Sequence, residues 1–144
     1  MGEKMDSIEM ALKRPFPESK IRWRKGGGGA ELAYITARDV MDRLDDVLGM
    51  ANWQTKYCWI GDRMICELSI KIGDQWITKS DGADDSNIEG AKGGISDALK
   101  RAAVLFGIAR YLYHPNAFDR NKKAASWATP EGFDKLMAER SKDK

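Results

Sequence analysis

The sequence predicts an α+β fold in which an antiparallel β-meander is covered by a long helix, giving a β-β-β-α core. Three runs between positions 53 and 80 alternate apolar and polar residues with the period of a β-strand. Gly61-Asp62 and Gly73-Asp74 separate these runs, and glycine in the first turn position is typical of a type II′ hairpin. A helical pattern from about Ile88 to Leu112 follows the third strand.

The N-terminal part begins with a short helix, predicted from about Met5 to Lys13 and stopped by Pro15. The IRWR segment that follows alternates apolar and basic residues. This alternation predicts a short half-buried strand with Arg22 and Arg24 on the same face.

Residues 26 to 29 are four consecutive glycines, which form a flexible loop that a ligand or another backbone can approach closely. No Gly-Lys-Ser/Thr sequence follows them, so the loop is not a Walker motif and no ATP site is predicted. After a short LAYI strand comes the best helical pattern in the chain, which Thr36 caps and Gly49 ends. Its acidic residues are interspersed with arginines, which favours a solvated surface over a metal site; they are Asp39, Asp42, Asp45 and Asp46.

The two cysteines lie on neighbouring strands of the meander. With a two-residue turn at Gly61-Asp62, Cys58 faces Ile65 and Cys66 faces Tyr57, so the sulfurs point to opposite faces of the sheet. We therefore expect no disulfide. The one histidine, His114, stands before a proline and cannot form a metal-binding cluster alone.

The long helix carries basic residues inside an apolar pattern. Lys92 and Lys100 are separated by two intervals of four residues, which places them on one face. Arg101 lies one turn beyond Asp97, and Arg110 falls near the predicted end of the helix. Beyond Tyr113 a basic stretch leads to a second predicted helix at about residues 130 to 141.

Charge is distributed unevenly along the chain, although the net charge is only +2. Residues 1 to 30 contain seven Lys or Arg against four acids, and residues 92 to 123 contain seven against two. Residues 31 to 91 contain six against twelve. If the fold brings the two basic blocks together, they form a positive groove suited to a phosphate backbone; otherwise these charges are a solvated surface.

The composition predicts a cytoplasmic globular protein, because 42% of the residues are apolar, 32% are charged, and no apolar run is long enough to span a membrane. We divide the chain into a main domain, residues 1 to 113, and a C-terminal extension with a short helix, residues 114 to 144.

An acidic loop between the third strand and the long helix offers an alternative function. Its carboxylates could form a metal-dependent nuclease site; they are Asp81, Asp84, Asp85 and Glu89. Nucleases place such groups on rigid elements beside a basic or water-orienting residue. A flexible acidic loop without a metal is therefore the favoured interpretation.

Three segments of the chain resemble conserved blocks of the Rad-fifty-two and Rad-twenty-two single-strand annealing proteins, especially their short phage and bacterial versions. They are LKRPFPESKIRWR, GGGAELAYITARDVMDRLDDVLGMANWQTKY and SDALKRAAVLFGIARYLY. The resemblance covers roughly residues 12 to 113 in the same order. It implies an ATP-independent protein of recombination and repair in the cytoplasm of a bacterial or phage-infected cell. Its implied partners are single-stranded DNA, the complementary strand and further copies of itself in a ring, with a single-strand DNA-binding protein as a further candidate.

The resemblance also implies which residues hold DNA. The family's arginine before the Gly-rich loop corresponds to Arg24, and the Lys-Arg pair of its long helix corresponds to Lys100 and Arg101. Tyr34 matches the aromatic residue that follows the loop, with a role in the groove wall or in packing. The chain departs from the family in two places: Val104 replaces a basic residue of the eukaryotic helix, and Ala109 stands where relatives often have glycine.

The resemblance does not extend to the long eukaryotic C-terminal region, so we do not expect recruitment of the strand-exchange recombinase.

An annealing protein must leave base edges free, so it needs a row of Lys and Arg that holds phosphates rather than base-reading pockets. No nucleophile, metal ion or other cofactor is required. The candidate DNA-binding residues are Arg22, Arg24, Lys25, Lys92, Lys100, Arg101 and Arg110. The alternative for the Lys-Arg pair is a helix salt bridge between Asp97 and Arg101 with Lys100 in solvent. We interpret most of the tryptophans on the strands as packing residues rather than base-stacking residues.

Overall fold

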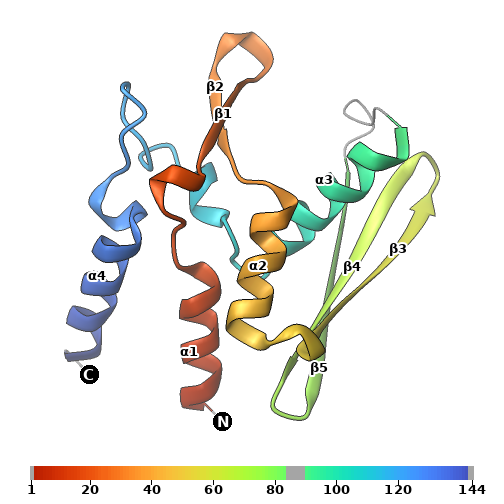
Figure 1. Ribbon diagram of the computed structural model, residues 1–144, viewed down its shortest axis with the longest axis horizontal. Coiled ribbons are helices and arrows are strands. Elements are labelled where there is room, and N and C mark those ends of the chain that lie inside the picture. Colours follow the sequence, from red (N-terminus) through yellow and green to blue (C-terminus); the bar gives the residue numbers. More distant parts are fainter. Residues whose placement is uncertain (1, 84–89, 143–144) are drawn as a thin grey trace. The chain divides into compact units, whose positions relative to one another are not determined.

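A computed structural model describes residues 2–83 and 90–142 as an α+β protein with antiparallel strands and helices, as predicted (Figure 1). The chain divides into two compact units. The first contains Met1–Leu12 and Thr36–Ile108, and the second contains Lys13–Ile35 and Ala109–Lys144. Residues 13 to 35 therefore belong with the C-terminal part of the chain rather than with the meander.

The first unit contains the predicted meander. Its strands β3 (Trp53–Ile60), β4 (Arg63–Ile72) and β5 (Gln75–Gly82) form one antiparallel sheet in the order β3-β4-β5. Gly61 and Gly73 both have a φ of 62°, and the aspartates after them keep negative φ, as type II′ turns require. The predicted register is confirmed, since Cys58 pairs with Ile65 and Cys66 pairs with Tyr57. Both cysteines are free, and burial raises the pKa of the Cys66 thiol to about 11.

The core of the first unit lies between the sheet and its helices. Helix α3 (Gly90–Val104) packs against β4, β5 and helix α2 (Ala37–Leu48). Alternate residues of β4 are buried, which matches the predicted period of two. The buried side chains include Val40, Leu44, Cys66, Leu68, Ile70, Ala98 and Ala102.

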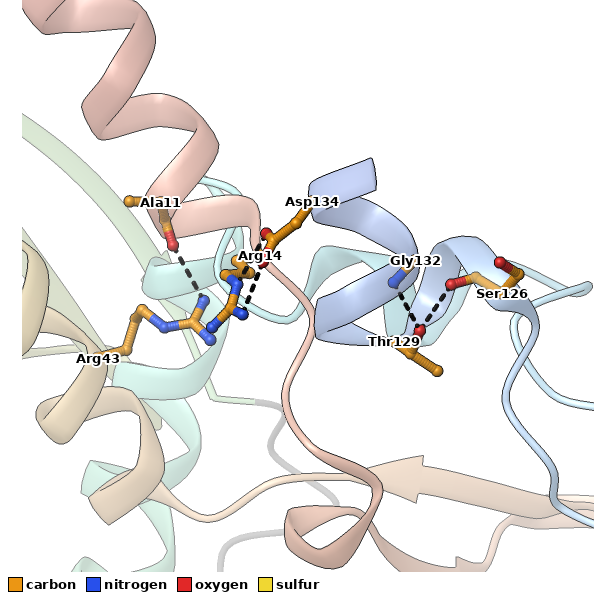
Figure 2. A network of polar contacts seen from close by, with 7 residues as sticks. All are labelled: Ala11, Arg14, Arg43, Ser126, Thr129, Gly132 and Asp134. Atoms are coloured by element: carbon orange, nitrogen blue, oxygen red, sulfur yellow. Dashed lines mark hydrogen bonds and ion pairs between the residues drawn. The ribbon is translucent and has the colours of Figure 1, made fainter. Parts of the chain in front are cut away.

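Helix α2 begins and ends as predicted. Thr36 and Asp39 form a capping box: the Thr36 hydroxyl accepts the Asp39 N–H at 3.2 Å, and the Asp39 carboxylate accepts the Thr36 N–H at 3.0 Å. Arg43 donates to the backbone oxygen of Ala11 (Figure 2) and to that of Leu12, both in the last turn of α1 (Gly2–Lys13). Asp39 and Arg43 therefore have structural partners and are not simply a solvated surface.

The predicted helix from Ile88 to Leu112 is wrong at its C-terminal end. Helix α3 ends at Val104, and the bonds from Leu105 N–H to Ala102 and from Phe106 N–H to Ala103 are of the tighter 3₁₀ type. Gly107 has a φ of 96° and Ala109 a φ of 63°, and a continuous right-handed helix cannot contain either value.

The predicted acidic loop also begins later than expected. Asp81 and Gly82 belong to strand β5, and the Asp81 carboxylate accepts the Gly82 N–H at 2.7 Å. Asp84, Asp85 and Glu89 lie outside the described residues.

The second unit joins a hairpin to the C-terminal part of the chain. The hairpin consists of β1 (Arg22–Lys25) and β2 (Glu31–Tyr34), and the C-terminal part ends in helix α4 (Pro130–Lys142), close to the predicted bounds. Arg14 forms a two-pronged ion pair with Asp134 of α4, at 2.8 and 3.0 Å (Figure 2). The Tyr111 hydroxyl accepts the Phe16 N–H at 3.0 Å.

In residues 2–83 and 90–142, no helix is long and apolar enough to cross a lipid bilayer.

Candidate nucleic-acid interface

One face of the β1-β2 hairpin combines two arginines with an aromatic ring. In the antiparallel register Arg22 lies opposite Tyr34 and Arg24 lies opposite Leu32, so these four side chains share a face. The Arg24 guanidinium carbon lies 5.7 Å from the centre of the Tyr34 ring, a cation–π contact. Arg22 and Arg24 are exposed, and Leu32 is 45% exposed. We call this set the arginine face.

Lys25 lies on the opposite face of the hairpin. It pairs with Glu31 in the register, and strand alternation places it with Trp23 rather than with Arg22 and Arg24. Lys25 therefore does not share the arginine face with Arg22 and Arg24, and its role in DNA binding stays a prediction. One residue of difference along a strand reverses the direction of the side chain.

The glycine loop between the two strands is open. Gly27–Gly29 form one 3₁₀ turn, in which Gly28 has a φ of 79° and Gly29 a φ of 85°, values that favour glycine. A Cβ atom added at Gly27, Gly28 or Gly29 would meet no atom within 4 Å. The tip of the hairpin therefore leaves space for another molecule beside the arginine face.

The Lys-Arg pair of α3 lies on the first unit. Arg101 Nε donates to the Asp97 carboxylate at 3.1 Å, and both Lys100 and Arg101 are half-buried. The salt bridge of the alternative interpretation is thus present. A partly exposed i,i+4 pair stabilises a helix by only about 0.3–0.5 kcal/mol, so the Asp97 carboxylate is a weak competitor for a phosphate. Lys92 also belongs to α3, two turns before Lys100, although its side chain lies outside the described residues.

Arg110 does not belong to the same helix as Lys100 and Arg101, in contrast to the prediction. It begins the 3₁₀ turn Arg110–Tyr113, after the left-handed Ala109, and it is exposed on the second unit. The candidate residues thus fall into two groups, one on each unit. That the two groups line one groove stays a prediction.

The acidic alternative gains no support from the described residues. Among residues 2–83 and 90–142, no group of three His, Cys, Asp or Glu side chains could hold a metal ion. Three of the four carboxylates proposed for the nuclease lie outside this part of the chain.

Comparison with known protein families shows to which family the chain belongs. Its residues 4–67 and 60–128 match the profile described as the Rad52/22 family of double-strand break repair proteins. The chain belongs to the Rad52/22 family. The resemblance of the three sequence blocks is therefore confirmed.

Two bacterial relatives of this Rad52/22 chain are named single-stranded DNA-binding protein DdrA. The proteins from Deinococcus radiodurans and Deinococcus deserti are each 31% identical to the chain in an alignment of 132 residues that covers 86% of the chain. The chain spans 61% of the first protein and 63% of the second.

This Rad52/22 chain also contains a basic loop that the sequence analysis did not include among the candidates. Lys122 Nζ lies 2.8 Å from the Glu31 carboxylate and 5.5 Å from the centre of the Trp23 ring. The Phe118 ring meets Trp23 edge-on, with ring centres 5.0 Å apart. The excess of basic residues from 120 to 123 was a visible signal, but the contact with β1 spans about a hundred residues of sequence and no local pattern predicts it.

Proposed function

We propose that this protein binds single-stranded DNA through its phosphate backbone and anneals it to a complementary strand without ATP, in homologous recombination and DNA repair. The arginine face of the hairpin carries this proposal. It presents two exposed guanidinium groups and an aromatic ring beside an open glycine loop. The printed names of the two Deinococcus relatives support the same ligand.

The chemistry of the arginine face suits a single strand held by its backbone. Guanidinium groups form two-pronged contacts with phosphate oxygens, and an aromatic ring accepts any base by stacking. Neither contact reads the hydrogen-bonding edge of a base. The base edges stay free to test a complement, which annealing requires.

Lys100 and Arg101 of α3 supply the second basic group in this proposal, with Lys92 two turns earlier on the same helix. We propose that this group, on the first unit, and the arginine face, on the second, both hold the backbone of the bound strand. Binding would then exchange the Asp97 partner of Arg101 for a phosphate. Because these contacts displace counterions, affinity falls as the salt concentration rises.

We further propose that copies of the chain assemble head to tail into a ring, with the β-β-β-α core as the repeated unit. Within the described residues β3 and β5 are both edge strands of the sheet, since each pairs only with β4. Trp59 on β3 is 52% exposed and Trp76 on β5 is 45% exposed. Two different unpaired edges allow β3 of one copy to meet β5 of the next, and such unlike contacts close into rings when the rotation permits.

The central experiment measures binding and annealing of complementary labelled oligonucleotides without ATP. We expect Arg24→Ala, and charge reversal of Lys100 and Arg101 to Glu, to abolish or strongly weaken strand binding while folding is kept. Lys135→Ala/Arg140→Ala, at two exposed residues of α4, is the control, since it removes two positive charges from the same chain. Normal binding by both the Arg24 and the Lys100/Arg101 variants would overturn the proposal.

The same assay distinguishes the nuclease alternative. Strand cleavage that requires a divalent ion and stops in EDTA would favour the acidic residues 81 to 89. Annealing that is unchanged by EDTA, with both strands intact, supports the binding protein.

Mass measurement in solution tests the assembly. Trp59→Glu places a charge on an exposed edge, and we expect it to yield smaller particles that remain folded. The matched control is Trp53→Phe, at the covered end of the same strand, where the indole N–H donates to Asp45 at 2.8 Å. A particle of unchanged mass for Trp59→Glu would contradict an interface at β3.

A further inference from the structure

We propose that the C-terminal loop Ala117–Ala125 is part of the nucleic-acid interface, in which Arg120 and Lys123 hold phosphates of the same strand that the arginine face binds. This inference rests on the proposed function and extends its site to a segment that the sequence analysis assigned to a separate C-terminal extension.

The loop has a fixed conformation. Residues Phe118 and Ala124 pair as an isolated antiparallel bridge, and Ala125 N–H donates to Ala117 O at 2.8 Å. Asp119 organises the tip, because its carboxylate accepts the N–H groups of Asn121 at 2.8 Å and Lys123 at 3.0 Å. A loop that is already ordered loses little conformational entropy when it binds a ligand.

The loop is held against the hairpin by one ion pair and two ring contacts. Lys122, which has a left-handed φ of 64°, reaches Glu31 of β2 at 2.8 Å and lies over the Trp23 ring. Phe118 packs edge-on against the same ring. These contacts lie on the Lys25 side of the hairpin, opposite the arginine face. Lys122 is therefore a positioning residue, whose charge is already paired.

The hairpin and the loop have a large excess of positive charge. The hairpin and the loop together carry six Lys or Arg against Glu31 and Asp119. Glu31 is paired with Lys122, and Asp119 accepts backbone N–H groups. Arg22, Lys25, Arg120 and Lys123 are exposed, and their side chains make no hydrogen bond or ion pair within residues 2–83 and 90–142.

A polyanion is the partner that fits such a surface. Unpaired cations on both faces of a narrow two-stranded hairpin favour a flexible single strand, which can pass around the hairpin edge, over a stiff duplex or a small anion. The loop would extend the site from the arginine face toward Lys25. Its contribution would be independent of base sequence, because it involves phosphates only.

The test compares the salt dependence of oligonucleotide binding for the parent chain and for Arg120→Ala/Lys123→Ala. Loss of two phosphate contacts is expected to reduce the slope of log affinity against log salt by about 1.4 and to weaken binding roughly tenfold near physiological salt. The loss should be equal for homopolymer and mixed-sequence strands. Both substitutions leave the backbone bonds of the loop intact, and circular dichroism checks the fold.

Two further variants separate the possible outcomes. Lys135→Ala/Arg140→Ala on α4 removes the same charge from the same unit and is expected to leave the slope unchanged. If Arg120→Ala/Lys123→Ala behaves like this control while Arg24→Ala loses affinity, the loop proposal is overturned and the proposed function stands. If the parent chain itself fails to bind single strands, both are overturned.

Discussion

Each of the two units of this Rad52/22 chain is stabilised internally by a different kind of interaction. The first, apart from its N-terminal helix, is formed by the continuous segment Thr36–Ile108 and has an apolar core between helices and a meander. The second combines Lys13–Ile35 with Ala109–Lys144, segments far apart in the sequence, through Arg14–Asp134, Lys122–Glu31 and the Trp23–Phe118 rings. Apolar burial is not directional, whereas these polar and ring contacts each require one geometry.

This difference has a functional consequence. The arginine face and the basic loop both lie on the second unit, in which ion pairs and ring contacts join segments far apart in the sequence. The unit with the larger apolar core provides the sheet edges through which we propose that copies assemble. In this arrangement, substitutions in the apolar core of the first unit should mainly reduce stability, and those at the exposed arginines and lysines of the hairpin and the loop should mainly alter the binding surface.

The largest effect is expected in the apolar core of the first unit. Leu68 of β4 is 0% exposed, and Leu68→Ala should lower the free energy of unfolding by about 2–5 kcal/mol, since it removes buried surface and leaves a cavity. Denaturant unfolding measures this. The matched change on the hairpin, Leu32→Ala, affects a side chain that is 45% exposed and should cost less than about 1 kcal/mol. Equal losses of stability in the Leu68 and Leu32 variants would contradict this difference between the two units.

A steric effect comes next, at the start of α4 in the second unit. Gly132 N–H donates to the Thr129 hydroxyl, and a Cβ atom at Gly132 would overlap the Ser126 carbonyl (Figure 2). Gly132→Ala should therefore destabilise the protein by about 1–3 kcal/mol, although alanine normally favours a helix. Gly27→Ala, where a Cβ meets nothing within 4 Å, is the control and should change the melting temperature little. Stabilisation by Gly132→Ala would show that this close contact does not exist.

The junction after α3 gives a smaller effect of opposite sign. Ala109 has a left-handed φ of 63°, which costs a residue with a Cβ atom about 1–2 kcal/mol. Ala109→Gly relieves this strain, so it should leave stability unchanged or raise it by up to about 1 kcal/mol. Ala103→Gly inside α3 should instead lose about 1 kcal/mol or more in the same unfolding measurement. A similar loss in both variants would mean that Ala109 is not strained.

The smallest effect is the pH dependence of the Arg14–Asp134 pair. The hydrogen bond from Arg14 lowers the pKa of Asp134 below its usual value. A lowered folded-state pKa stabilises the protein above the unfolded pKa, and this contribution disappears as the pH falls through the folded value. Asp134→Asn should therefore cost about 0.2–1 kcal/mol at pH 7, as is typical of exposed pairs, and this cost should disappear as the pH falls through the lowered pKa of Asp134. If the loss of stability caused by Asp134→Asn did not change with pH, it would come from packing rather than from the ion pair.

Local side-chain patterns predicted the structure correctly in several parts of the chain. The alternation of residues 53 to 80 and the two Gly-Asp turns predicted the strands of the meander and the register of Cys58 and Cys66. The capping box at Thr36 was equally local. The prediction of the long helix failed after Val104, where Gly107 and Ala109 have positive φ. The apolar sequence pattern continues past the residue at which the helix ends, so it gave no sign of this change.

The sequence indicated the candidate residues of the site but not how they are arranged in space. Resemblance to the family indicated Arg24, Lys100 and Arg101, yet alternation along β1 turns Lys25 away from Arg24. Arg110 belongs to a different unit from Lys100. The Asp97–Arg101 salt bridge was predicted as an alternative, and it is present.

By itself, the sequence of this protein determined its α+β class, its meander and its membership of the Rad52/22 family, because these depend on short-range periodicity and on residues in a fixed order. Only the tertiary structure decided that residues 13 to 35 belong with the C-terminal part of the chain, and that Lys122 is paired with Glu31 while Arg120 and Lys123 stay exposed. The physical reason is that such contacts join residues about ninety positions apart. The cost of closing so long a loop is offset only by the whole set of contacts formed together, which no local pattern encodes.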